Sequence, residues 1–326
     1  MTILGIETSC DETAAAISKE GNILSSQVST QTIHRKYGGV VPEIASREHE
    51  KLLNDMVVDT LQFSHLSKSN LDGIAVTQGP GLSGTLIAGV CFAKGLAQGL
   101  QIPIIGINHL EAHIFANFLA DPELEFPFIC LLVSGGHTQL WFVGGLGEYK
   151  LMGETRDDAA GEAFDKGARI LGLGYPGGPE IESLGKSGNE HAVSFPRALM
   201  QNKNLEFSFS GLKTSLLYHM ESGSKFSKPD VAASYQYAIV DVLITKLFWA
   251  LEKSECETCV IAGGVAANMF MRKQIQLKMP EKKIIFPDLS YCTDNAAMIA
   301  YLGELYLKSG KISPLDFPVL PNMKLI

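Results

Sequence analysis

The sequence predicts an α/β protein with two lobes that share one organisation. Short apolar runs of strand length alternate with longer segments of helical periodicity. A pattern of strand, small polar turn and strand over residues 3–18 recurs over residues 126–143. Because the two copies share organisation but little identity, they indicate a duplicated fold with a cleft between its lobes. Apolar residues make up 46% and charged residues 19%, which allows a sizeable core and excludes wholesale disorder.

The first half is predicted to be a strand meander followed by a β-α-β unit. Strands are expected at residues 3–7, 13–18, 23–28, 73–76 and 102–107. Apolar positions recur at helical spacing over residues 43–63, and a second helix is expected over 83–100. The connection through this second helix should be a right-handed crossover between parallel strands.

The second half repeats the strand pair and then alternates strands with helices. Strands are expected at residues 128–133, 138–143, 258–262 and 282–286, and helices at 268–277 and 293–307. Asp121–Glu125 is polar and contains a proline, which is typical of a junction between lobes. The last fifteen residues carry three prolines and should lie along the surface.

The chain is acidic, with 27 Lys and Arg against 35 Asp and Glu, a net charge of −8. Such a chain can bind nucleic acid only through a local basic patch or a basic partner. Acidic residues at 7, 11 and 12 interrupt any signal peptide, and the longest apolar stretch, 86–93, is too short to cross a bilayer. We expect a cytoplasmic, reduced protein with no membrane partner.

Six cysteines do not form a disulfide framework in a chain of this length. Cys256 and Cys259 form a lone Cys-x-x-Cys pair, whereas a zinc ribbon needs two such pairs. The pair suits redox chemistry or a structural role. Because Cys259 opens an apolar run, we favour a buried structural thiol.

The sharpest chemical signal is the sequence His-Leu-Glu-Ala-His at residues 109–113, directly after a predicted strand. On a helix, His109 and His113 face the same way, one turn apart, and can bind one metal ion. The alternative is a pair of helix histidines that meet solvent. Glu111 should point away from the shared face, so it is a poor base for a zinc-bound water, unlike the glutamate of the zinc-protease pattern.

A third metal ligand is needed, and Asp294 is the candidate. It lies at the start of a predicted helix, where an N-cap or first-turn carboxylate is equally expected. The sequence leaves the choice between cap and ligand open. Two histidines and one carboxylate suit iron(II), or zinc with a further ligand.

Three glycine-rich loops follow predicted strands, at residues 79–85, 134–138 and 263–264. Their backbone N–H groups can approach an anion because no Cβ interferes, and two of the loops precede helices. Together they indicate a nucleotide-binding cleft, although each glycine turn alone is ordinary.

Two further segments are candidates for binding. Asp158, Glu162 and Asp165 are spaced to form one acidic helical face, which is either solvated or an acceptor for ribose or substrate hydroxyls. The segment 195–213 carries aromatic and basic residues and is either an RNA-facing patch or ordinary surface.

Taken together, these motifs make the chain resemble the family of tRNA N6-adenosine threonylcarbamoyltransferases, once labelled O-sialoglycoprotein endopeptidases. The resemblance runs in register from residue 3 to about 305. The matching motifs are Gly5–Thr13, Gly79–Leu82, His109–His113, Leu132–Thr138, Asp165–Lys166, Gly172–Pro179, Phe207–Lys213, Gly263–Asn268 and Asp294–Ala296.

The resemblance implies the actin/Hsp70/sugar-kinase fold, with a ribonuclease-H-like sheet in each lobe and a nucleotide between the lobes. We expect an N-terminal lobe over 1–124, completed by about 294–326, and a C-terminal lobe over 125–293. The family implies a metal ion, iron(II) or else zinc, held by His109, His113 and Asp294. Its substrate contacts correspond to Leu132, Val133, Ser134, Gly135, Gly136, Asp165, Gly178 and Asn268, with Glu182 as an addition.

The implied reaction moves a threonylcarbamoyl group from threonylcarbamoyl-AMP to N6 of adenosine 37, in tRNAs that read codons beginning with adenine. Asp11 and Glu12, in the first turn, are expected to orient the amine or accept its proton. The family also implies a shorter paralogue and a P-loop ATPase as partners.

Three other functions are compatible with parts of the sequence. A metal-dependent peptidase needs a glutamate poised on the metal-bound water. A small-molecule kinase of the same fold does not need a pair of histidines. A non-enzymatic scaffold should lack that pair, which this sequence retains.

Overall fold

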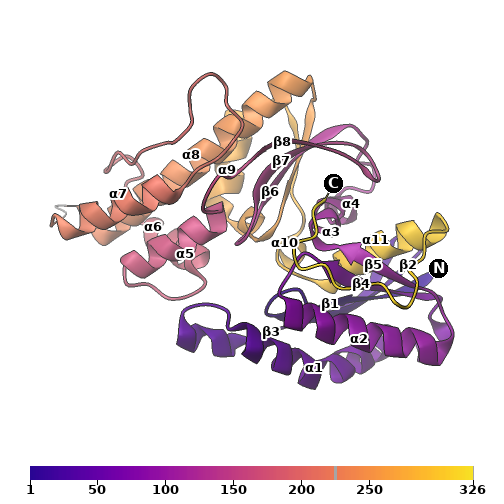
Figure 1. Cartoon of the computed structure of the whole chain (residues 1–326). Helices are drawn as coiled ribbons and strands as arrows, with labels where there is room; N and C mark the ends of the chain where they lie inside the picture. The colour runs from indigo at the N-terminus through magenta and orange to yellow at the C-terminus, as the bar shows by residue number, and fades with distance from the viewer. Residues whose placement is uncertain (224–225, 326) are drawn as a thin grey trace. The chain divides into compact units, whose positions relative to one another are not determined.

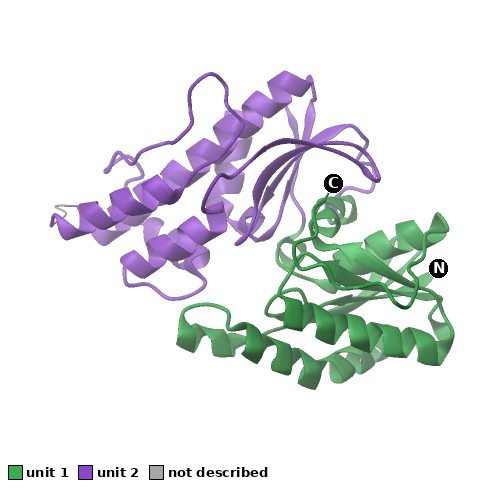
Figure 2. Ribbon diagram, viewed as in Figure 1, with its two compact units in different colours: residues 1–119, 288–326 green, residues 120–287 purple. Residues whose placement is uncertain are grey.

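The computed structural model describes residues 1–223 and 226–325, and the chain divides into two compact units. Unit 1 comprises residues 1–119 and 288–326, and unit 2 comprises residues 120–287 (Figure 2). The first unit is therefore discontinuous in sequence, because its last helix and the segment after it follow the whole of unit 2. The domain boundaries predicted from the sequence stay a prediction.

Unit 1 is built on a five-stranded mixed sheet (Figure 1). Its strands are β1 (Thr2–Glu7), β2 (Glu12–Lys19), β3 (Asn22–Thr30), β4 (Gly73–Gly79) and β5 (Ile104–Asn108). The strand order is β3-β2-β1-β4-β5; β2 is antiparallel to β1 and to β3, and β4 is parallel to β1 and to β5. All six residues of β1 are buried, as expected for a central strand covered on both faces.

Helices cover both faces of this sheet. They are α1 (Pro42–Phe63), α2 (Ser83–Leu100), α3 (His109–Phe115), α4 (Asn117–Ala120), α10 (Leu289–Cys292) and α11 (Ala296–Lys308), with 3₁₀ turns η1 (Thr32–Tyr37) and η2 (Lys68–Asn70). Leucines and valines of α1 and α2 pack against one face, and alanines of α11 pack against alanines of β2 on the other. A Cβ on Gly5 would lie 2.5 Å from the Ala296 carbonyl oxygen, so glycine at this position lets α11 approach β1 closely.

The segment after α11 is more than a surface tail. The Ser313 amide donates to the Ile104 carbonyl, and the Leu320 amide donates to the Gln78 carbonyl, so the segment follows β5 and β4. Between them, Phe317 is 7% exposed and packs into the core formed by β1, β4, α1 and α2.

Unit 2 repeats the sheet of unit 1. Its strands are β6 (Phe128–Val133), β7 (Thr138–Gly145), β8 (Glu148–Glu154), β9 (Thr258–Ala262) and β10 (Lys283–Ile285). The order is β10-β9-β6-β7-β8, with β7 antiparallel to β6 and β8, and β9 parallel to β6 and β10. This is the topology of the first sheet, and it confirms the repeated organisation predicted from the sequence. Every predicted strand is present; β8 is an addition.

The helices of unit 2 are α5 (Ala160–Ile170), α6 (Gly177–Gly185), α7 (Ser210–Glu221), α8 (Lys228–Ser254) and α9 (Met269–Lys278), with the 3₁₀ turn η3 (Gly264–Ala267). The sequence patterns did not predict α8. This 27-residue helix is long and apolar enough to cross a membrane, but 78% of its most apolar window is buried inside the protein. It is therefore the core helix of unit 2.

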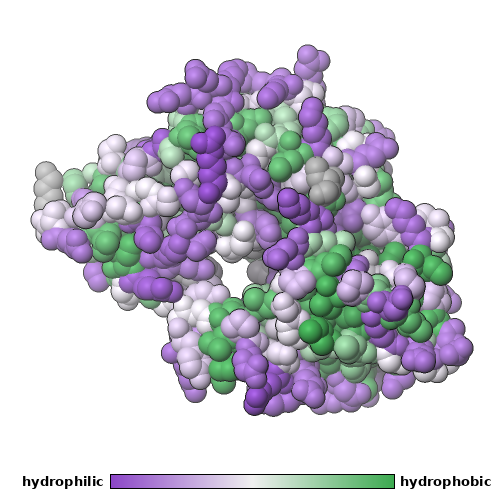
Figure 3. Space-filling view, viewed as in Figure 1, coloured by the Kyte–Doolittle hydropathy of each residue, from purple (hydrophilic) through white to green (hydrophobic). Residues whose placement is uncertain are grey.

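The surface mixes hydrophilic and hydrophobic side chains (Figure 3). In the view drawn, hydrophobic colour gathers over α2 and the C-terminal segment of unit 1. Ile87, Leu315 and Leu320 are among the exposed apolar residues of these segments.

Candidate metal centre

The two motif histidines lie on α3, as the sequence predicts. Asn108 caps this helix, because its Oδ1 accepts from the Leu110 amide at 2.9 Å and from the Glu111 amide at 3.2 Å. Both histidines are buried, and their rings meet edge to face with centroids 4.7 Å apart. The alternative of two helix histidines meeting solvent is thereby excluded.

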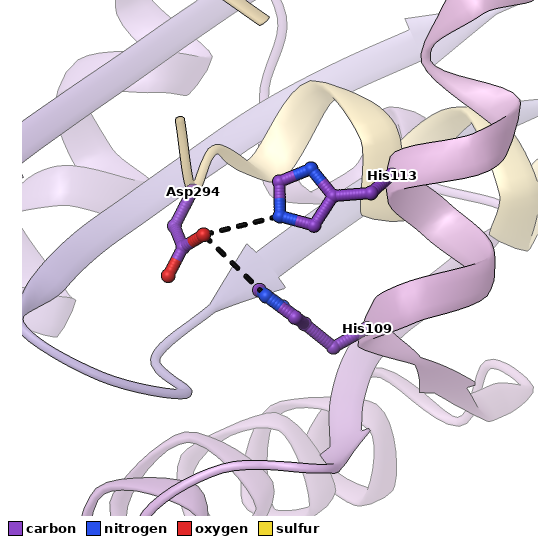
Figure 4. A group of neighbouring side chains, drawn as sticks. All are labelled: His109, His113 and Asp294. Atoms are coloured by element: carbon purple, nitrogen blue, oxygen red, sulfur yellow. Dashed lines mark hydrogen bonds and ion pairs between the residues drawn. The ribbon is translucent and has the colours of Figure 1, made fainter. Parts of the chain in front are cut away.

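Asp294 completes the group (Figure 4). Its Oδ1 lies 3.4 Å from Nε2 of His109 and 3.1 Å from Nε2 of His113. One ligand atom from each of the three residues falls within 4.8 Å of the others. The tertiary structure thus brings together three residues separated by up to 185 positions in the sequence.

Asp294 does not cap the helix that follows it. α11 begins at Ala296, and Asn295 is its N-cap, with Oδ1 accepting from the Met298 amide at 3.0 Å. The capping role is therefore excluded for Asp294, whose carboxylate faces the histidines, and its role as a metal ligand stays a prediction.

Glu7 is a member of this site that the sequence analysis did not assign. Its Oε2 accepts from Nδ1 of His109 at 2.9 Å and from the Thr77 hydroxyl at 2.6 Å, and its Oε1 accepts from the Ser9 amide. A carboxylate on Nδ1 leaves Nε2 of His109 facing Asp294, the arrangement that commonly orients metal-binding histidines. One feature of the sequence could have indicated this role: a glutamate ends a mostly apolar strand, and every residue of that strand is buried.

The charged groups of the candidate metal centre shift the pKa values of their neighbours. Burial lowers the pKa of His109, but the carboxylates of Glu7 and Asp294 outweigh this effect and raise it well above its usual range. Burial raises the pKa of Asp294, yet the two histidines hold it below its usual range. Burial lowers the pKa of His113. A cation that binds to the imidazole and the carboxylate must displace the proton that they share.

These residues fit a divalent metal ion. Two imidazole nitrogens and one carboxylate oxygen form a donor set typical of iron(II), and of zinc with a further ligand. Nδ1 of His113 is buried without a hydrogen-bond partner among the described residues, while Nε2 of the same ring faces Asp294. Glu111 does not join the group, because its carboxylate accepts a hydrogen bond from Tyr306.

Of the predicted catalytic carboxylates, Asp11 lies in the turn before β2 and Glu12 is the first residue of β2. His49 fixes the preceding turn, with Nε2 donating to the Cys10 carbonyl at 2.9 Å and Nδ1 2.8 Å from the Thr13 hydroxyl. Burial, together with the charges of Asp294 and Asp11, raises the pKa of Glu12 to about 9. Glu12 is thus electrostatically linked to the candidate metal centre, while both catalytic roles stay predictions.

The glycine loop at residues 134–136 lies in the turn between β6 and β7, directly after Leu132 and Val133. Its base is fixed, because the Ser134 amide donates to the His137 carbonyl at 2.8 Å and the Ser134 hydroxyl accepts from the His137 amide. A Cβ on Gly135 or Gly136 would meet no described atom within 4 Å. The loop therefore has an open face, as expected for backbone that approaches a ligand.

The other predicted substrate contacts of unit 2 have structural partners. Asp165 accepts from the Gly177 amide at 2.7 Å, one residue before Gly178. Asn268 caps α9 through the Met271 amide at 2.7 Å and donates to Gln236. Glu182 accepts from the Phe270 amide at 3.0 Å. Asn268 and Glu182 thus meet at the start of α9, a convergence that the sequence did not reveal.

Two sequence interpretations need correction. α5 begins at Ala160, so Asp158 precedes the helix, and Lys166 pairs with both Asp158 and Glu162 rather than leaving an acidic face. The aromatic rings of the segment 195–213 are at most 3% exposed and cannot stack on bases, so the segment is not an aromatic RNA-facing patch. Those rings are Phe195, Phe207 and Phe209.

The structural interpretation of the Cys-x-x-Cys pair is favoured. Cys256 and Cys259 are both buried as free thiols. Burial raises the pKa of Cys259 to about 12, which disfavours the thiolate that redox chemistry requires.

Comparison with solved structures defines the class of protein. The chain resembles component A of (R)-2-hydroxyglutaryl-CoA dehydratase from Acidaminococcus fermentans, with 17% identity and a TM-score of 0.57 over 95% of this chain and 100% of that one. It also resembles HypF from T. kodakarensis, with 16% identity and a TM-score of 0.63 over 94% of this chain and 48% of that one. With its two sheets of one topology, the protein has the actin/Hsp70/sugar-kinase fold predicted from the sequence.

Sequence comparison identifies the family. The model of the family described as tRNA N6-adenosine threonylcarbamoyltransferase matches residues 22–301. Relatives with that name, from Thermosipho africanus and Desulfitobacterium hafniense, are 50% and 49% identical over the whole of this chain and 100% and 98% of their own length. The chain belongs to this family and is a tRNA-modifying acyltransferase.

Proposed function

We propose that this protein transfers the threonylcarbamoyl group of threonylcarbamoyl-AMP to N6 of adenosine 37, in tRNAs that read codons beginning with adenine, with a metal ion held by His109, His113 and Asp294. The observation that carries this proposal is the convergence of those three side chains within 4.8 Å, in a chain of this family. Iron(II) is the metal we favour, with zinc as the alternative, because the donor set suits both.

The reaction is an acyl transfer. The N6 amine forms a bond to the carbamoyl carbon, the bond from that carbon to the phosphate oxygen breaks, AMP leaves, and the amine gives up a proton. When bound, a divalent cation supplies Lewis acidity and a template for oxygen ligands. His109, oriented by Glu7, would hold the cation through Nε2 together with His113 and Asp294.

The remaining roles belong to the loops and the first turn. Asp11, in the turn that His49 fixes, would orient the amine or accept its proton. Glu12 begins β2, and because its pKa of about 9 keeps its carboxyl group protonated at neutral pH, it would orient the amine. Backbone N–H groups of Gly135 and Gly136 would bind the phosphate on the open face of their loop. Ser134 would contact the substrate from the base of the loop, where its own amide donates to the His137 carbonyl. The other proposed nucleotide and substrate contacts are Leu132, Val133, Asp165, Gly178, Glu182 and Asn268.

We also propose that the protein works in the cytoplasm with a shorter paralogue and a P-loop ATPase. The net charge of −8 supports a tRNA-binding surface that partners complete, because phosphate groups repel an acidic chain. The isolated chain should accordingly bind tRNA weakly.

Mass spectrometry of tRNA nucleosides tests the proposed reaction. Unmodified tRNA is incubated with threonine, bicarbonate, ATP, the partner proteins and either the wild-type chain or a variant. We expect N6-threonylcarbamoyladenosine with the wild type, and a loss on the order of 100-fold for His109→Ala, since one of three ligands is removed. The matched control is His191→Ala, a histidine whose side chain is 65% exposed. Full activity of His109→Ala with no metal bound would refute the metal role.

A further inference from the structure

The carboxylate of the histidine motif is buried and tied to the helix that follows Asp294. Glu111 lies on α3 between the two histidines in sequence and is 5% exposed. Its Oε1 accepts a hydrogen bond from the Tyr306 hydroxyl, on α11. The Tyr306 ring is itself covered by Lys311, whose Nζ lies 4.3 Å from the ring centroid. A buried carboxylate is costly without such a partner, so this contact is a specific feature of the helix interface.

This contact gives α3 a second attachment to the segment that carries Asp294. The first attachment is the candidate metal centre, where Asp294 lies two residues before α11 begins. The second lies at Tyr306 of α11, ten residues and about 15 Å of helical rise beyond Ala296, the first residue of the helix. Two attachments fix the angle between α3 and α11, and with it the spacing of the three ligand side chains.

We propose that Glu111 and Tyr306 are positioning residues that preorganise His109 and His113 against Asp294 for a divalent cation. The inference rests on the proposed metal role of these three residues. It assigns a function to the central glutamate of the motif that differs from that of a catalytic base, because Glu111 acts through the helix interface and does not touch the cation. Groups that orient metal ligands from outside the coordination sphere typically change metal affinity by 10- to 100-fold.

Cobalt(II) binding to the full chain tests this inference. Affinity is measured by competition with a chromophoric chelator, and the visible absorption of bound cobalt reports the coordination geometry. Tyr306→Phe removes the hydroxyl and keeps the ring, and should lower affinity about tenfold and alter the cobalt spectrum. Tyr301→Phe is the matched control on the same helix, since its hydroxyl makes no hydrogen bond to the described residues. Urea unfolding of the metal-free variants measures any separate loss of stability.

Conservative replacement of Glu111 distinguishes positioning from packing. Glu111→Gln keeps an oxygen that accepts from Tyr306 and should bind cobalt within about threefold of the wild type, whereas Glu111→Ala should match or exceed the loss in Tyr306→Phe. Unchanged affinity and spectrum in Tyr306→Phe would overturn the inference, even if the variant unfolds more readily. A wild-type chain that binds no cobalt, zinc or iron(II) would instead refute the metal assignment on which the inference rests.

Discussion

At the scale of single residues, the candidate metal centre depends on which nitrogen of each histidine is available. The carboxylate of Glu7 engages Nδ1 of His109, and Thr77 and Ser9 engage the carboxylate in turn. This chain of hydrogen bonds selects the ring orientation in which Nε2 faces Asp294. The ligand set alone therefore describes the site incompletely, because the orientation comes from residues outside it.

Glu7→Gln is expected to lower the affinity for zinc or cobalt by 10- to 100-fold. The amide is neutral and keeps the size of the side chain, but it has one acceptor oxygen where the carboxylate has two, so it cannot serve His109, Thr77 and Ser9 in the same way. Competition with a chromophoric chelator measures the change. Glu50→Gln, at an exposed position of α1, is the control and should bind like the wild type. An equal affinity for both variants would remove Glu7 from the site.

At the scale of elements, the ends of helices hold the functional loops in place. Asn108, Asn268 and Asn295 each cap a helix whose first turn adjoins a predicted site residue. A side-chain cap satisfies amides that the helix itself leaves unpaired, and it fixes the direction in which the chain enters the helix. The positions of His109, Asn268 and Asp294 are thus set partly by local capping.

Asn295→Ala is expected to lower the free energy of unfolding by about 1 kcal/mol, because the Met298 amide loses its acceptor. Urea denaturation of the metal-free chain measures it. Asp294→Ala should lack this particular loss, since Asp294 does not cap α11, and should instead abolish tight metal binding. A cap-like destabilisation in Asp294→Ala and none in Asn295→Ala would reverse the assignment of the two residues.

Asp157 links α7 to the end of β8 and gives a pH-dependent prediction. Its carboxylate accepts from the Phe209 and Ser210 amides and from the Ser208 and Ser210 hydroxyls. Burial raises the pKa of Asp157, but these hydrogen bonds outweigh burial and lower it. A carboxyl group with a lowered pKa in the folded state stabilises the protein above its unfolded pKa of about 4, and this contribution disappears as pH falls through the lower folded value.

We therefore expect Asp157→Asn to be less stable than the wild type at pH 7, with the difference shrinking as the pH is lowered below about 4. Urea denaturation across this pH range measures both proteins. The control, Asp59→Asn, replaces an exposed aspartate of α1 and should track the wild type. A difference that grows toward acid pH would contradict the assigned direction of the pKa shift.

At the scale of the whole molecule, unit 1 is assembled from the two ends of the chain. α11 packs on β1 and β2 through small residues, and the segment after it follows β4 and β5. This segment also contacts the residue that caps the histidine helix, because Nδ2 of Asn108 donates to the Lys324 carbonyl while its Oδ1 caps α3. Residues near the C-terminus thus support a site whose histidines lie in the first half of the chain.

Phe317→Ala is expected to lower the free energy of unfolding by about 3 kcal/mol, because it leaves a cavity in the core of unit 1. Leu315→Ala, two residues away and 47% exposed, should cost far less. Urea denaturation compares the two variants. Equal small losses would show that the segment contributes little to the core.

The sequence by itself predicted the repeated order of the strands, several of the helices and the family. Local periodicity and glycine turns predicted all the strands except β8, because these signals depend on neighbouring residues. The long helix α8 was not predicted, since a helix buried on most of its surface lacks the polar stripe that marks an amphipathic helix. The pair of histidines was visible in the sequence because the two residues lie one turn apart on one short helix.

Only the tertiary structure decided which distant groups complete the site. Asp294 was an equal candidate for cap and ligand until α11 was seen to begin at Ala296. Strand pairing brings Glu7 to His109, 102 positions away in the sequence. Helix packing brings Tyr306 to Glu111, 195 positions away. The buried rings of segment 195–213 exclude an aromatic RNA-facing patch, one of the two alternatives that composition left open. Contacts of this kind depend on the packing of remote elements, which local sequence patterns do not encode.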